Sequence, residues 1–117
     1  MAMALLASPS WGYKQEDLDK LAATNTCQEC DLAGADLHLA YLREADLERV
    51  DLSHASLRGA NLAVANLAVA DLAGADLRGT VLTGAVLRDA KIDFADFTKA
   101  KFCNTVMPDG QRIFKDC

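Results

Sequence analysis

The sequence predicts an all-β repeat protein in which the chain coils repeatedly and the coils stack. The 117 residues suffice for one small domain. Hydrophobic residues make up 51% of the chain and aromatic residues only 6%, so the core must be aliphatic. A large apolar residue recurs every five positions, and turn-forming residues recur between these positions.

Residues 1–13 are expected to precede the folded domain. The segment Met1–Gly12, MAMALLASPSWG, has a short apolar stretch followed by small residues, like the end of a secretory signal. The basic region that usually comes first is missing, and the apolar stretch is too short to span a membrane. We interpret the segment as a trimmed export signal, with a flexible or packed arm as the alternative. No other segment approaches a transmembrane helix, so we expect no membrane insertion.

Residues 14–26 are predicted to form an N-terminal capping α-helix. The stretch KQEDLDKLAA is amphipathic, because Leu18, Leu21 and Ala22 share one face. Acidic residues cluster in its first turn, where they favour the positive end of the helix dipole. We expect the helix to cover one open end of the stacked coils.

Residues 27–104 are predicted to hold the repeat. Fifteen consecutive units of five residues recur without an insertion around the consensus A-[D/N]-L-x-x. Alanine stands two residues before the central apolar residue in twelve of them, and Asp or Asn stands directly before it in nine. The central residues are Leu32, Leu37, Leu42, Leu47, Leu52, Leu57, Leu62, Leu67, Leu72, Leu77, Leu82, Leu87, Ile92, Phe97 and Phe102.

A period of five fits neither a helix nor a flat strand. On a helix the central residues would drift by roughly 140° per unit, and on a strand they would alternate between faces. The pattern is explained if the chain bends once per unit. Five of the seven glycines occupy the last position of a unit, which supports a corner there: Gly34, Gly59, Gly74, Gly79 and Gly84.

The segment from Cys30 to Asn104 resembles a pentapeptide-repeat protein. The resemblance implies a right-handed quadrilateral β-helix with four units per coil, or about 3.75 coils for these fifteen units. A residue then stacks on the residue twenty positions later. The central columns become Leu32/Leu52/Leu72/Ile92, Leu37/Leu57/Leu77/Phe97, Leu42/Leu62/Leu82/Phe102 and Leu47/Leu67/Leu87, with Cys27 continuing the last column.

Residues 105–117 are predicted to form a C-terminal cap. Met107-Pro108-Asp109-Gly110 is a strong turn signal. The chain then returns, and Ile113 and Phe114 are available to cover the other end of the stack.

The four cysteines permit three disulfide pairings. We favour Cys27–Cys30 and Cys103–Cys117, because the two pairs lie at opposite ends of the expected stack. That separation also disfavours a zinc site made from all four. A redox role for the C-x-x-C pair stays open, although a redox pair normally starts a helix and this one follows a helix.

The ends of the repeat resemble lumenal members of the family from cyanobacteria and chloroplasts. The resemblance is carried by the segments 17–27 and 102–110. It implies a photosynthetic source and a thylakoid-lumen or periplasmic location, with a cytoplasmic location as the alternative. Two disulfides agree with an oxidising compartment.

Composition and motifs argue against nucleic-acid binding, catalysis and the binding of a cofactor or metal. A net charge of −5 argues against nucleic-acid binding, because such a binder needs a basic surface. We find no catalytic constellation, no phosphate-binding loop, and no cofactor or small-molecule site. His38 and His54 make a poor metal site. A column of Asp31, Asp51 and Asp71 is interpreted as a solvated face, with a weak cation site as the alternative.

The remaining candidate is an apolar surface. Val64, Val69, Val81 and Val86 occupy positions that the repeat turns outward on the third and fourth faces, accompanied by Ala63 and Ala68. Scattered exposed aliphatic residues are common, whereas a contiguous patch marks a partner or self-association surface. We therefore expect a non-enzymatic scaffold that binds another protein or itself. The alternatives are a DNA mimic that inhibits an enzyme such as gyrase, and a thiol-disulfide redox protein.

Overall fold

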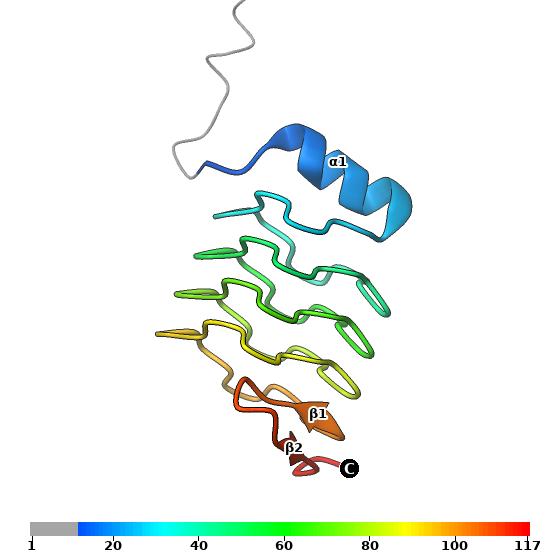
Figure 1. Ribbon diagram of the computed structural model, residues 1–117, viewed down its shortest axis with the longest axis vertical. Helices are drawn as coiled ribbons and strands as arrows, with labels where there is room; N and C mark the ends of the chain where they lie inside the picture. Colours follow the sequence, from blue (N-terminus) through cyan, green and yellow to red (C-terminus); the bar gives the residue numbers. More distant parts are fainter. Residues whose placement is uncertain (1–11) are drawn as a thin grey trace, which may run out of the picture.

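The chain forms a stack of coils between a helix and a short hairpin. The computed structural model describes residues 12–117, and residues 1–11, which hold most of the expected export signal, lie outside the described residues. Helix α1 (Gln15–Thr24) lies across the N-terminal end of the stack, which Figure 1 draws at the top and which we call the lower end because residue numbers rise from it. Strands β1 (Thr105–Val106) and β2 (Arg112–Ile113) pair antiparallel at the other, upper end.

Parallel backbone pairing joins each coil to the next. Bridges connect residues twenty positions apart, from Thr26–Asp46 through Val86–Val106, which confirms four five-residue units per coil. The N–H of Leu52 donates to the carbonyl of Asp71 in the coil above, at 2.8 Å. In return, the N–H of Asp71 donates to the carbonyl of Val50 below, at 2.9 Å. Each unit thus forms hydrogen bonds in both directions.

Every unit ends in a corner with a left-handed residue. The carbonyl of Leu32 accepts the N–H of Ala35 at 3.0 Å, and Gly34 between them has φ 72°. Positive φ at the third turn residue is the requirement of a type II turn. Sixteen units have such a corner, because Glu29 at φ 60° adds one to the fifteen counted in the sequence. This extra unit, residues 25–29, lacks the repeat's residue pattern and completes four coils.

The central residues point inward and form four columns, one for each face. The first to fourth faces are those of Leu32, Leu37, Leu42 and Leu47 respectively. The leucines in the middle coils are fully buried. Leu37, Ile92 and Phe97 are only partly buried, because the end coils lack a neighbour on one side.

Two aspartates close the ends of the backbone ladder. At the lower end, the carboxylate of Asp17 in α1 accepts the N–H of Asp31 at 2.8 Å. At the upper end, the carboxylate of Asp116 accepts the N–H of Phe102 at 2.9 Å. Both N–H groups belong to positions that elsewhere donate to a neighbouring coil. Each carboxylate therefore takes the place of a carbonyl from a coil that does not exist.

The inward register predicts opposite outcomes at adjacent positions. Leu67→Asp places a charge without a partner between coils, and we expect a loss of more than about 4 kcal/mol in the free energy of unfolding. Asn66→Asp should change it by less than about 0.5 kcal/mol, because a carboxylate can also accept the Ala68 N–H that Asn66 accepts now. Thermal melting followed by circular dichroism measures both, and equal damage would disprove the register.

Candidate interaction surface

The four predicted valines occupy two kinds of position. Val64 and Val69 are corner residues at either edge of the fourth face, with 48% and 44% of their surface exposed. Val81 and Val86 precede central residues in the extended part of a unit and are half-buried. We call these four residues the valine surface.

The two corner valines have strained backbones. Both have φ 60°, in the left-handed region that a β-branched residue rarely occupies. A side chain with a Cβ costs about 1–2 kcal/mol there, which glycine avoids. This strain was not predicted from the sequence, although the glycines at five equivalent positions were the signal that could have revealed it.

The two coil segments that hold the valine surface carry no charge. Residues 59–70 contain no ionisable side chain, and neither do residues 79–87 in the coil above them. Asn61 and Val81 pair across these coils, as do Asn66 and Val86, so the two uncharged segments lie side by side. Ala63, expected to face outward, is instead buried at 4% exposure.

The strain makes a prediction about stability. Val69→Gly should raise the free energy of unfolding by about 0.5–1 kcal/mol, because relief of the strain exceeds the entropy that glycine adds to the unfolded chain. Ala68→Gly is the matched control, since Ala68 has no positive φ, and it should lower stability. Denaturant unfolding measures both variants, and an equal loss in the two would contradict the strain at Val69.

A second surface feature is a charged groove on the second face. Its volume is about 820 Å³, and Asp36, His38, Arg58, Asp76 and Arg78 contribute to its lining. The guanidinium of Arg78 donates two hydrogen bonds to Asp76, at 2.8 and 2.7 Å. These bonds lower the pKa of Asp76 to about 2. The neighbouring hydrogen bond from His38 lowers the pKa of Asp36. The acids Asp36 and Asp76 of the groove are therefore both engaged in local surface pairs.

The predicted acidic column and the two histidines have local roles. Asp31, Asp51 and Asp71 each accept the N–H of the residue two positions later, at 3.0–3.3 Å, and so hold their own corners. His38 pairs with Asp36, whereas the ring of His54 lies over Gly74 in the next coil. Within residues 12–117, no group of three or more His, Cys, Asp or Glu side chains is placed to hold a metal ion.

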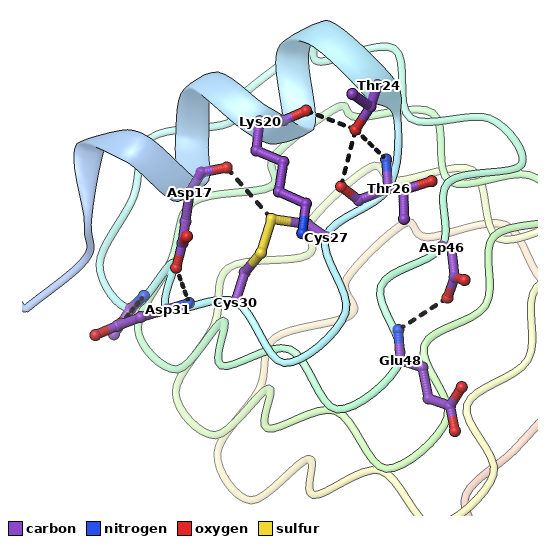
Figure 2. Close-up of a disulfide and its surroundings, with 10 residues drawn as sticks. Asp17, Lys20, Thr24, Thr26, Cys27, Cys30, Asp31, Asp46 and Glu48 are labelled. Carbon is purple, nitrogen blue, oxygen red and sulfur yellow. Dashed lines mark hydrogen bonds between the residues drawn. A yellow bond between two sulfur atoms is a disulfide. The ribbon is translucent and has the colours of Figure 1, made fainter.

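The first predicted disulfide joins Cys27 to Cys30 between α1 and the stack (Figure 2). Both cysteines are buried, and the sulfur of Cys27 lies 3.3 Å from the carbonyl oxygen of Asp17. Because Asp17 also binds the N–H of Asp31, helix and bridge are attached to the same end of the stack. A buried bridge behind a helix is poorly accessible to an attacking thiolate.

The second predicted disulfide joins Cys103 to Cys117 at the opposite end. It fixes the last residues against the upper coil, next to the Asp116–Phe102 hydrogen bond. That hydrogen bond lowers the pKa of Asp116. Both predicted pairings are present, and the described residues contain no free cysteine. None of the described segments forms a helix long and apolar enough to cross a membrane.

Comparison with family models gives one match. The model described as pentapeptide repeats matches residues 26–63, 45–84 and 65–104, which together span most of the chain. No curated protein sequence matches the chain.

Comparison with solved structures gives matches from cyanobacteria and a plant. The structure of Rfr23 from Cyanothece 51142 is 24% identical with a TM-score of 0.54, and the match covers 78% of this chain and 79% of that one. HetL from Nostoc sp. PCC 7120 is 33% identical with a TM-score of 0.45, and the match covers 75% of this chain but only 43% of HetL. A protein from the Arabidopsis thaliana thylakoid lumen is 23% identical with a TM-score of 0.30, covering 86% and 73%.

Proposed function

Because the chain belongs to the pentapeptide-repeat family, we propose that it is a non-enzymatic scaffold that binds a protein partner through the valine surface. Its coils would form a right-handed quadrilateral β-helix, as the twenty-residue stacking and the four corners per coil support. The partner is another protein or a second copy of this chain. We propose no cofactor, nucleic acid or small-molecule substrate.

The observation that carries this proposal is that two exposed valines are the β-branched residues among the sixteen corners, all of which have positive φ. Glycine occupies five corners and would occupy these two at lower cost. Strained residues persist where a function requires their side chains. Val64 and Val69 also border the part of the surface that carries no charge. An apolar patch of this kind is suited to contact with another protein.

The two alternative functions have less support. A DNA mimic needs free carboxylates at regular spacing, whereas Arg78 pairs with both Asp76 and Asp96 on the second face. A redox protein needs an accessible thiolate with a lowered pKa. The Cys27–Cys30 bridge is buried under α1 and is better suited to holding the helix in place.

We further propose that the protein functions in an oxidising compartment, the thylakoid lumen or the periplasm. The support is the pair of disulfides, one at each end of the stack. A small domain with an incompletely covered core at its ends gains most from such bridges.

This location predicts the state of the thiols in the cell. Rapid acid quenching followed by alkylation should label no cysteine in the native protein. After reduction, the reagent should label Cys27, Cys30, Cys103 and Cys117. Mass spectrometry of the digested protein measures the labels, and modified cysteines before reduction would contradict the proposed compartment.

The binding proposal predicts separate effects on association and stability. Val69→Lys with Val86→Lys adds two charges to the valine surface and leaves the inward columns unchanged. We expect partner capture or self-association to be lost, while the melting temperature moves little. Sedimentation velocity and pull-down from the native compartment measure association.

A matched control places the same charges on the opposite face. Leu39→Lys and Ser56→Lys alter one corner residue and one extended-position residue of the second face, as the test pair does on the fourth. The control should associate like the unaltered protein. If both double variants retain association, the valine surface is not the binding site.

A further inference from the structure

We propose that the charged groove on the second face binds a small organic monocarboxylate with an apolar tail, as a ligand and not as a substrate. This inference goes beyond the proposed function, because the groove lies on the face opposite the valine surface and shares no residue with it. No such site was expected from the sequence, because its residues come from all four coils and meet only through the twenty-residue stacking.

The groove is hollow because two successive corners along its edge lack side chains. Gly59 and Gly79 are these corner residues, with φ 71° and 70°. The corner residue of the coil below is Leu39, and that of the coil above is Lys99. These two side chains border the hollow at its ends, about 14 Å apart along the stack. The volume of about 820 Å³ lies in the usual range of small-molecule sites.

The floor of the groove is open at Gly79. Apart from its chain neighbours, a Cβ added to Gly79 would come within 4 Å of backbone atoms of Gly59 alone. A Cβ added to Gly59 would instead meet the end of the Leu39 side chain at 2.7 Å. Leu39 therefore leans over Gly59, and it remains 74% exposed. Its methyl groups offer apolar contact to a ligand at the lower end of the hollow.

Charge is divided between the two edges of the groove. The lining acids precede the central residues of their units, at the edge remote from the glycines, whereas Arg58 and Arg78 each stand directly before a glycine. The lining holds three fixed positive charges against two negative ones, in a chain whose net charge is −5. The edge beside the glycines is thus locally positive and suits a ligand with one negative charge.

Arg58 is the cation best placed to bind that charge. In the coil above, Arg78 pairs with Asp76 of its own unit at 2.7 Å. The unit of Arg58 has Ser56 in place of this acid, and Arg58 forms no ion pair with any described residue. The same holds for Lys99 at the upper end. A guanidinium can donate two parallel hydrogen bonds to one carboxylate.

The rest of the lining favours a ligand with an apolar tail. The stems of Arg58, Arg78 and Lys99 are aliphatic, and together with the glycines and Leu39 they surround the charged heads with apolar surface. A carboxylate bound over the glycines leaves its tail to pack against Leu39. A polyanion such as a nucleic-acid backbone would also meet the acids at the remote edge.

The direct test is titration of the oxidised protein with octanoate, measured by calorimetry and by the NMR shift of the Arg58 side chain. Octanoate should bind about tenfold or more tightly than acetate, which lacks the tail, and than octylammonium, which has the opposite charge. An Arg58 signal that does not move would overturn the site. Tighter binding of octyl phosphate would overturn the assignment to a carboxylate.

The first pair of variants tests the charge. Arg58→Gln should weaken octanoate binding about tenfold or more, because it removes the guanidinium and keeps most of the stem. Arg88→Gln is the matched control and should bind like the unaltered protein. Arg88 has the same position in its unit and also forms no ion pair with any described residue, but the corner after it is Asp89 and lies outside the groove.

The second pair of variants tests the shape. Gly79→Asn should weaken octanoate binding because its side chain fills the floor, and asparagine fits this backbone, since Asn104 occupies a corner at φ 56°. Gly84→Asn makes the same change at the next corner, outside the groove, and should leave binding unchanged. Leu39→Asn removes only apolar contact, so it should weaken octanoate and leave acetate unchanged. Circular dichroism of each variant checks that the coils remain folded.

The outcomes are independent of the valine surface, because they are read from ligand affinity and not from association. Octanoate binding that Arg58→Gln, Gly79→Asn and Leu39→Asn all leave unchanged would place the ligand elsewhere and overturn the inference. Equal losses in the groove variants and in their controls would overturn it as well. Weakened binding in the groove variants alone supports it.

Discussion

The backbone ladder between coils imposes the conditions that the rest of the structure satisfies. In the middle coils, each central N–H donates upward and each preceding N–H donates downward, so two successive coils must stay in register at twenty residues. That register requires four bends per coil, and every bend needs a residue at positive φ. The inward columns, the buried alanines and the exposed corners all follow from it. A unit with an unusual sequence, such as residues 25–29, adopts the same path because its neighbours above it hold its backbone.

Much of this arrangement could be predicted from the spacing of the apolar residues. A central leucine every five positions identifies the inward side of each unit, and the structure buries these leucines in the middle coils. The count of units could not be predicted in the same way, because Asn25-Thr26-Cys27 lacks both alanine and leucine. The roles of Asp17 and Asp116 could not be predicted either, because each carboxylate accepts a hydrogen bond from a backbone N–H that is distant in the sequence. A repeat pattern carries information about identical environments and little about its ends.

The candidate surface, too, could be predicted only in part from the sequence. Outward positions followed from the repeat, so all four valines were found, but their unequal exposure depends on whether each stands at a corner or in an extended piece. Ala63 is buried even though its position in other units is at least partly exposed, including those where alanine also stands there, so residue type alone does not account for its burial. The strain at Val64 and Val69 depends on backbone angles, which composition alone does not report. Val64 and Val69 differ from the nine other non-glycine corners in being β-branched, and this combination of residue type and backbone angle is what singles them out.

The four-cornered coil also governs which lengths this protein could have. α1 and the hairpin are attached to particular faces, so their relative orientation about the stack depends on how many units separate them. Loss or duplication of one whole coil would leave every column continuous and both ends facing as they do now. Gain or loss of a single unit would keep a perfect repeat but turn one end by a quarter of a revolution against the other. Insertions or deletions of twenty residues therefore preserve the relative orientation of the two ends. Insertions or deletions of five, ten or fifteen residues alter that orientation.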